Sequence, residues 1–230
     1  MKNLLLSSLL VFITGTAQAQ TPIISLVPVS KVFIPKGFDS NDMAEIVITG
    51  FLPNLCYKSP IVKTKVEGRK ITLSVYAINS EASAGLECTR MIVPFLIPVD
   101  VGVLDRGQYQ VSVNHEEKGQ MKITEALSPA VDEHVYAYVE NILIKPGSRS
   151  IILKGHNPSD CYVFDRVEYF HNDKDVYSVL PKMKQVSHDC PMKMIPFSIV
   201  TEVPEDLDEE RVLLHVRSMH GKSVNAVFEK

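Results

Sequence analysis

The chain contains two similar segments. Residues 50–57, GFLPNLCY, return as GHNPSDCY at residues 155–162, with Gly, Pro, Cys and Tyr at identical internal spacing. Self-similarity at a fixed distance along a chain is the signature of duplicated structural units. A length of 230 residues suits two domains of about 100 residues, each with its own hydrophobic core. The sequence therefore predicts two copies of one domain, over residues 20–128 and 131–230.

The N-terminus has the three parts of a secretory signal peptide. Lys2 provides a positive n-region, residues 4–13 an apolar h-region, and Ala17-Gln18-Ala19 a cleavage site of small residues. No later apolar run approaches the roughly 18 residues that a membrane-spanning helix needs. We expect residues 1–19 to be removed and the mature chain to be exported to the periplasm or the extracellular space, without membrane insertion.

Charge and composition exclude some partners. The chain has 24 Lys and Arg against 27 Asp and Glu, a formal net charge of −3 at pH 7. Nucleic-acid-binding proteins concentrate Lys and Arg in a basic patch or stripe, which this sequence lacks. We therefore expect the partner to be a protein or a polysaccharide of the cell envelope, and not a nucleic acid.

The four cysteines lie at matching places in the two copies. The segment CTRMIVPF begins at Cys88, and its counterpart CPMKMIPF begins at Cys190. Four cysteines in an exported chain suggest disulfides rather than a metal or redox site. Of the three possible pairings, the repeat selects Cys56 with Cys88 and Cys161 with Cys190. Each bridge should stabilise its copy by roughly 3 to 4 kcal/mol in the chain-entropy model.

Apolar and polar residues alternate with a period of two along most of the mature chain, as in half-buried β-strands. Turns rich in Gly, Pro and Asp separate the alternating segments. Seven short strands in about 100 residues are typical of a two-sheet sandwich. The expected strands are residues 26–34, 45–49, 61–66, 70–78, 92–101, 108–114 and 121–125 in the first copy, and 135–144, 150–154, 163–170, 176–185, 194–203, 212–217 and 224–229 in the second.

One local pattern favours a particular sandwich. Residues 104–111, LDRGQYQV, resemble the tyrosine corner of immunoglobulin-like domains, in which the hydroxyl of a residue such as Tyr109 binds the backbone of the preceding turn. The chain has no Trp, and Val212 replaces the Tyr in the second copy. The chain resembles bacterial exported proteins built from tandem immunoglobulin-like or fibronectin-type-III-like repeats. The resemblance implies an all-β fold of two seven-stranded sandwiches, and a short linker near residues 127–130 predicts a bent or end-to-end rod.

No catalytic motif is present. The sequence lacks G-x-S-x-G, H-E-x-x-H, C-x-x-C, a Walker loop and a dinucleotide fingerprint. We therefore expect the protein not to be an enzyme.

Two groups of residues suggest metal sites. Six of the seven histidines lie from position 134 onward, and His156, His188 and His220 fall in three loops that the sandwich brings to one end. They could bind zinc or copper, or charge together in acid; the alternative is that these loops contain histidine without convergence. The acidic segments 39–42 and 205–210 suggest calcium, with solvated surface charge as the alternative.

The function that we favour from the sequence is a non-catalytic exported binding or structural module, since loops on rigid scaffolds commonly carry recognition. For Tyr57 and Tyr162 the alternative role is to pack over the disulfides. The candidate contact residues in the loops are Asn54, Leu55, Tyr57, Lys58, Asn157, Asp160, Tyr162 and Phe164.

Two other functions remain open. Pilus-type periplasmic assembly chaperones also have a signal peptide and two immunoglobulin-like domains, and they donate an alternating strand to a subunit. Residues 121–127, just before the linker, do alternate. The acidic charge and the two matching cysteine pairs fit that family poorly. A protease inhibitor built on such a sandwich is the second alternative.

Overall fold

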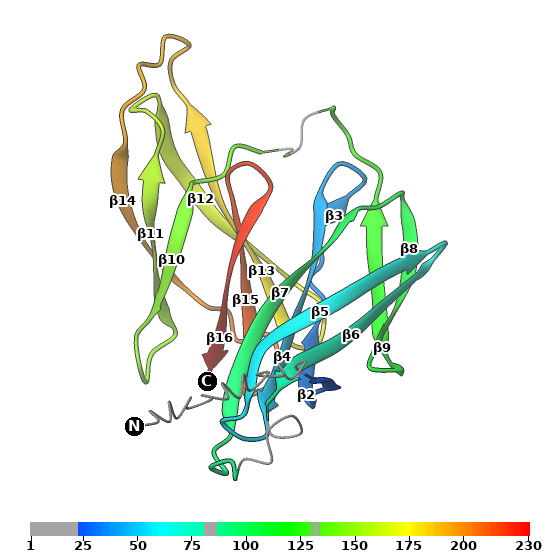
Figure 1. Ribbon diagram of the computed structural model, residues 1–230. Coiled ribbons are helices and arrows are strands. Elements are labelled where there is room, and N and C mark those ends of the chain that lie inside the picture. Colours follow the sequence, from blue (N-terminus) through cyan, green and yellow to red (C-terminus); the bar gives the residue numbers. More distant parts are fainter. Residues whose placement is uncertain (1–22, 81–86, 130–131, 133) are drawn as a thin grey trace, which may run out of the picture.

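The computed structural model describes residues 23–80, 87–129, 132 and 134–230. All the regular secondary structure in these residues is β-strand (Figure 1). The expected signal peptide, residues 1–19, lies outside the described residues. Within the described part, no helix is long and apolar enough to cross a membrane. The expected all-β fold is confirmed.

The N-terminal half, up to residue 129, has two sheets. The first has the order β2-β4-β7, and the second runs β5-β6-β8-β9, with β1 on β6 and β3 on β9. Alternate residues of each strand enter a core between the sheets, where Ile71, Leu73 and Val75 of β6 are fully buried. The strands are β1 (Ile23–Leu26), β2 (Val29–Phe33), β3 (Phe38–Asp39), β4 (Met43–Leu52), β5 (Tyr57–Glu67), β6 (Lys70–Asn79), β7 (Val93–Val103), β8 (Gly107–Val113) and β9 (Glu116–Thr124).

The C-terminal half, from residue 132, repeats this scheme with sheets β10-β11-β14 and β12-β13-β15-β16. A separate core lies between them, with Ile151, Leu153 and Val212 fully buried. The strands are β10 (Val139–Ile144), β11 (Ser150–Asn157), β12 (Tyr162–His171), β13 (Val176–Gln185), β14 (Ile195–Glu202), β15 (Arg211–Ser218) and β16 (Lys222–Glu229).

The strand segments predicted from alternation are confirmed, with one systematic difference at each first strand. The sequence predicts one strand over residues 26–34. In the structure β1 pairs with β6, and the chain then crosses to the other sheet, where β2 pairs with β4. Pro28 lies at the crossing, where a residue without an N–H group interrupts a ladder least. Residues 135–137 likewise lie against β13, and the chain then crosses to β11 as β10.

The sheet order differs from that of immunoglobulin domains. There the third strand pairs with the sixth, and the fourth lies in the other sheet or at an edge. Here β6 corresponds to the fourth immunoglobulin strand, but it lies between β5 and β8 and runs parallel to β8. In the C-terminal half, β13 and β15 form the same parallel pair. A parallel pair needs a crossover, and β7 and β14 in the opposite sheets provide it.

The two halves pack face to face rather than as a rod. In β4, Ile46 and Ile48 face their own core, whereas Val47 lies on the outer face with Phe33. Together with Val176 and Leu213 of the sheet β12-β13-β15-β16, they form one cluster of four buried side chains between the halves. A linker of a few residues therefore permits lateral packing, because each half has a second apolar sheet face to cover.

Candidate binding surface at the disulfide pole

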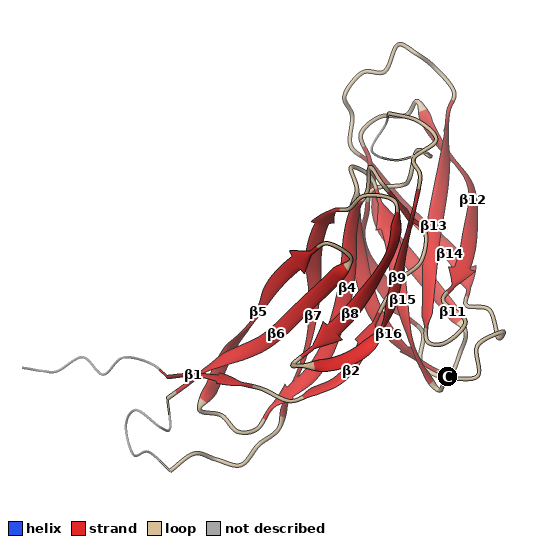
Figure 2. Cartoon of the chain, turned by 90° about the vertical axis from the view of Figure 1, so that its right-hand side faces the viewer, coloured by secondary structure: helices blue, strands red, loops and turns tan. Residues whose placement is uncertain are grey.

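The structure joins Cys56 to Cys88 and Cys161 to Cys190, as the sequence predicts. The Cα–Cα distances of 5.8 and 5.6 Å lie in the ordinary range for disulfides. Cys56 lies in the loop between β4 and β5 and Cys161 in the loop between β11 and β12, and these two loops lie at opposite ends of the molecule (Figures 1 and 2). The N-terminal and C-terminal disulfide poles therefore form two separate surfaces.

The C-terminal disulfide pole consists of the loops 157–161, 186–194 and 219–221. The Cys161 N–H donates to Ser159 Oγ at 3.0 Å, which shapes the first loop as a tight turn. The second loop is fixed at both ends: the N–H of Val186 donates to Cys161 O at 2.8 Å, and that of Lys193 to Pro158 O at 2.9 Å. The bridge and these bonds hold the loops together at the end of the sandwich.

A cavity of about 450 Å³ opens at this pole. Its walls come from four separate segments of the chain, and thioethers and imidazoles dominate its chemistry. The lining residues are Tyr138, His156, Pro158, Met192, Lys193, Met194, Met219 and His220.

The structure brings two of the three candidate histidines to one cavity. His156 and His220 line the same cavity, but His188, although it lies in the same pole, is not among the lining residues. In the described residues, no group of three or more His, Cys, Asp or Glu side chains could hold a metal ion. The expected three-histidine site is therefore wrong, because loop 186–194 directs its methionines, and not His188, to the cavity.

Two neighbours fix the ring of His156. Its Nδ1 lies 3.3 Å from Glu140 Oε2, and its ring packs against that of Tyr138 with centroids 4.7 Å apart. His220 lies in the turn between β15 and β16 with φ of 65°, a left-handed conformation that His adopts more readily than most residues. Both imidazoles are therefore positioned by local structure.

The eight candidate contact residues divide into two groups. Leu55, Lys58, Asp160 and Phe164 are exposed and available to a partner. Tyr57 and Tyr162 are partly buried and pack against the two cores, which favours a structural role for them. Asn54 Oδ1 accepts the Cys56 N–H at 2.9 Å and shapes its turn. Asn157 is only 5% exposed, so its assignment as a contact residue is wrong.

The acidic segments are engaged by protein groups. Asp42 accepts hydrogen bonds from Arg217 across the two halves, and Asp39 Oδ1 accepts the Asn41 N–H at 2.8 Å. In the second segment, Glu209 pairs with Lys31 at 3.1 Å, and Asp206 accepts a hydrogen bond from Tyr177. Four carboxylates of the two acidic segments therefore have partners within the protein.

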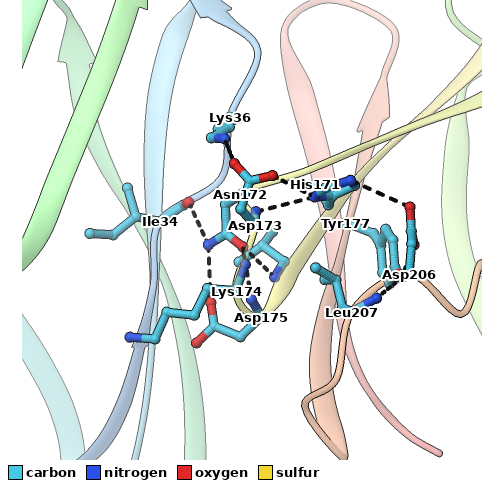
Figure 3. Close-up of polar contacts among 11 residues, drawn as sticks. Ile34, Lys36, His171, Asn172, Asp173, Lys174, Asp175, Tyr177, Asp206 and Leu207 are labelled. Atoms are coloured by element: carbon cyan, nitrogen blue, oxygen red, sulfur yellow. Dashed lines mark hydrogen bonds and ion pairs between the residues drawn. The ribbon is translucent and has the colours of Figure 1, made fainter.

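Sequence reasoning missed the polar contacts between the halves, which Figure 3 shows around the turn 171–175. The Asn172 amide donates to Ile34 O at 3.3 Å, and Asp173 pairs with Lys36. His171 lies between two carboxylates, 3.1 Å from Asp173 and 3.4 Å from Asp206. The turn thus ties the N-terminal half to the C-terminal core.

At the inner end of this chain of contacts lies the buried hydroxyl of Tyr177. It donates to the Asp206 carboxylate and accepts the Leu207 N–H at 3.2 Å. Burial, and then the hydrogen bond to Asp206, raise the pKa of Tyr177 well above its usual value. The phenol therefore stays protonated and anchors the segment before β15.

A second polar cluster lies deeper between the halves. Glu45 Oε1 accepts hydrogen bonds from Ser223 at 2.9 Å and Asn225 at 2.7 Å, and lies 3.4 Å from Nδ1 of the buried His215. Burial opposes ionisation, but the hydrogen bond and charge of His215, with the other two donors, hold the pKa of Glu45 below its usual value. The carboxylate therefore acts as a fixed acceptor in the interface.

Comparison with known proteins gives one match. Residues 46–123 match the family model described as the ORF11 beta-sandwich domain, a segment that spans β4 to β9. No curated protein and no solved structure matches the chain. The two disulfides suggest an oxidising, extracellular environment. The family match and the all-strand fold together identify the chain as a β-sandwich protein.

Proposed function

We propose that the protein is a non-catalytic exported binding module made of two tandem β-sandwich domains, and that the C-terminal disulfide pole contacts a protein partner. The observation that carries the proposal is the exposure of large apolar side chains at this pole. Met192 is 94% exposed and Met194 is 67% exposed, and Val186 of the same loop and Phe164 of β12 are also exposed. Clusters of this kind on a folded protein mark interaction sites.

The tandem arrangement is supported by details that recur in both halves. Gly50 and Gly155 occupy the same position beneath an aromatic ring, that of Phe95 in one half and Phe197 in the other. The strand order β5-β6-β8-β9 of the N-terminal half also returns as β12-β13-β15-β16, with a parallel pair in the middle of each, although β1 and β3 extend the first sheet. These shared features favour residues 20–128 and 131–230 as two copies of one immunoglobulin-like domain with an altered strand order.

A protein partner fits the pole better than a polysaccharide does. Methionine side chains are flexible and polarizable, and they adapt to irregular apolar surfaces on a partner. A sugar site instead needs precisely placed polar groups that fix the orientation of the hydroxyls. The exposed thioethers of Met192 and Met194 therefore favour a partner with an apolar surface of its own.

The chaperone alternative has one structural argument in its favour. The edge of β9 is paired with β3 only at residues 123 and 124, so residues 116–122 offer an edge for strand addition. Against it, the cations between the halves are engaged: Lys36 pairs with Asp173, and Arg217 with Asp42. They are not free to anchor the terminal carboxylate of a subunit.

The experiment is cross-linking of the native protein in its own cells, followed by purification of the captured protein and a direct affinity measurement. The variant Phe164→Ser/Val186→Ser removes apolar contacts from the C-terminal pole. The control Leu55→Ser/Met91→Ser makes the same change at the N-terminal pole. We expect a loss of affinity of at least tenfold in the first variant alone.

The identity of the captured protein separates the functions. A pilin-like subunit whose affinity responds to changes in β9 would favour the chaperone, and a peptidase would favour the inhibitor. Equal affinities of both variants and the wild type would contradict a contact at the C-terminal pole.

A further inference from the structure

The cavity at the C-terminal disulfide pole brings together sulfur and nitrogen donors from distant parts of the chain. Met192 and Met194 come from the loop before β14, Met219 from the turn between β15 and β16, and His156 from β11. The spacing Met-Lys-Met alone would not predict this site. The fold creates it by placing the β15–β16 turn beside the loop 186–194.

The exposure of the methionines is unusual for an apolar side chain. Met192 and Met194 project from the pole, although methionine is usually a core residue. A role in core packing is therefore excluded for both. Met219 is half-buried and lines the cavity from the other side. Flexible thioethers around a shared space can close on a small ligand without a change of fold.

His156 has the environment of a metal-binding imidazole. Its Nδ1 lies 3.3 Å from Glu140 Oε2, so the carboxylate faces Nδ1 and favours the tautomer in which Nε2 is free to bind a metal. A carboxylate on the second nitrogen orients the ring and raises its basicity as a ligand, and such partners are typical of metal-bound histidines. Glu140 therefore acts as a positioning residue for Nε2.

The donor set selects the metal. Thioethers are soft ligands that prefer copper(I), whereas calcium and magnesium need oxygen ligands, and zinc needs thiolate, imidazole or carboxylate. In the described residues no three His, Cys, Asp or Glu side chains form a metal site, and all four cysteines are in disulfides. Lys193 also lines the cavity, and its long side chain can extend its ammonium group into water. The Lys193 ammonium group repels a metal ion with a single positive charge, such as copper(I), less than it repels a divalent ion.

We propose that the C-terminal disulfide pole binds one copper(I) ion through the thioethers of Met192, Met194 and Met219 and Nε2 of His156. The exposed imidazole of His220, at the mouth of the cavity, is placed to complete the site. The Cys161–Cys190 bridge and the hydrogen bond from Lys193 N to Pro158 O hold the loop in position before the metal arrives. This inference rests on the proposed function, which assigns the C-terminal disulfide pole as the binding surface, and it adds a metal ligand at that surface.

The test is a titration of the purified protein alone with copper(I), kept reduced by ascorbate so that the disulfides stay intact, against a coloured copper(I) chelator. We expect one equivalent to bind. The variant Met192→Leu/Met194→Leu keeps the apolar bulk and should bind at least tenfold more weakly. Glu140→Gln should weaken binding by about 10 to 100-fold, as loss of a carboxylate that orients a metal ligand does. The control Met91→Leu changes an exposed methionine in the segment after Cys88, at the N-terminal disulfide pole, and should have no effect.

Three results would overturn the proposal: no competition with the chelator, equal affinity in the double leucine variant, or tighter binding of zinc than of copper(I) or silver(I). Chemical shifts of the methionine methyl groups during titration with silver(I) give an independent readout, because only the three cavity methionines should move. Capture of the protein partner is measured without metal. A metal-free pole that still binds its partner would show that this inference fails while the proposed function holds.

Discussion

Arg217 in the C-terminal half and Asp42 in the N-terminal half form a buried, bidentate ion pair. Arg217 Nη1 lies 3.2 Å from Asp42 Oδ2, while Nη2 donates to Oδ1, and both side chains are at most 7% exposed. The guanidinium also stacks over the ring of Phe38 at 5.3 Å. This buried pair couples the two halves, because removal of either partner would leave the other charge buried, unpaired and without solvation by water.

The first prediction concerns this pair. Asp42→Asn leaves the Arg217 cation buried with one carboxylate fewer, which should lower the free energy of unfolding by about 3 to 5 kcal/mol. Denaturant unfolding measures the change. The control Glu125→Gln breaks the exposed pair with Arg106 and should cost about 0 to 1 kcal/mol. Equal small effects of the two variants would mean that Arg217 finds sufficient compensation in Asp132, 3.3 Å away.

The second prediction concerns acid. The folded pKa of Glu45 lies below its unfolded value of 4.5, so the stability it contributes is present above about pH 4.5 and is lost as the pH falls through the folded pKa. The difference in unfolding free energy between the wild type and Glu45→Gln should therefore shrink as the pH falls below 4.5. Urea unfolding at a series of pH values measures it. Parallel curves for the two proteins would contradict the assignment.

The third prediction concerns the tyrosine corner, whose hydrogen bond is confirmed: Tyr109 donates to Asp105 O at 2.9 Å. Tyr109→Phe removes this bond and keeps the buried ring, so it should cost about 1 kcal/mol of unfolding free energy. Urea unfolding of the full chain measures the loss. An unchanged midpoint would mean that the ring alone, which also lies beneath Arg69, supports the turn.

The fourth prediction concerns the replacement of that corner in the C-terminal half. Val212 has no hydroxyl, and the neighbouring strand provides Tyr177 instead, which holds the buried Leu207 N–H and the Asp206 carboxylate. Tyr177→Phe leaves the Leu207 N–H without its acceptor and should cost about 1 to 3 kcal/mol. A loss no larger than that of Tyr109→Phe would mean that water reaches Leu207. Hydrogen exchange at the Leu207 amide is the direct measurement.

Much of the fold could be predicted from the sequence, because the alternation of apolar and polar residues along a strand reflects which side chains face the core. Strand β13 has the predicted bounds, 176–185, since polar turns end it on both sides. The packing of the halves was missed, although the run Ile46-Val47-Ile48 carries its signal: apolar residues on both faces indicate a strand covered on both sides. The partner face could not be identified, since complementarity between Val47 and Leu213 arises only in three dimensions.

The candidate site was less predictable than the fold. Strand order placed the loops of His156, His188 and His220 at one pole, but the path of a nine-residue loop decides which side chains reach a cavity. Hydrogen bonds between residues that are distant in sequence set that path, such as the one from Lys193 N to Pro158 O. Met219 could not be connected with Met192 from the sequence for the same reason.

The last prediction concerns the glycine of the repeated motif. A Cβ atom on Gly155 would lie 1.9 Å from Tyr138 O and 3.0 Å from the Phe197 ring, because the chain of β10 approaches β11 closely enough for the His156 N–H to bond Tyr138 O. The clash is with a backbone atom, so the added methyl group fits only if the two strands move apart. Gly155→Ala should therefore cost about 1 to 3 kcal/mol or more, as overpacking in a core does.

The same change at the matching place gives the control, since a Cβ on Gly50 would lie 2.3 Å from Pro28 O and 2.4 Å from the Phe95 ring. Thermal unfolding should show a loss in both variants, because each glycine admits the crossing of the first strand from one sheet to the other. If Gly155→Ala were neutral while Gly50→Ala unfolded the protein, the two glycines would have different roles, and the repeated motif would no longer support a common architecture of the halves.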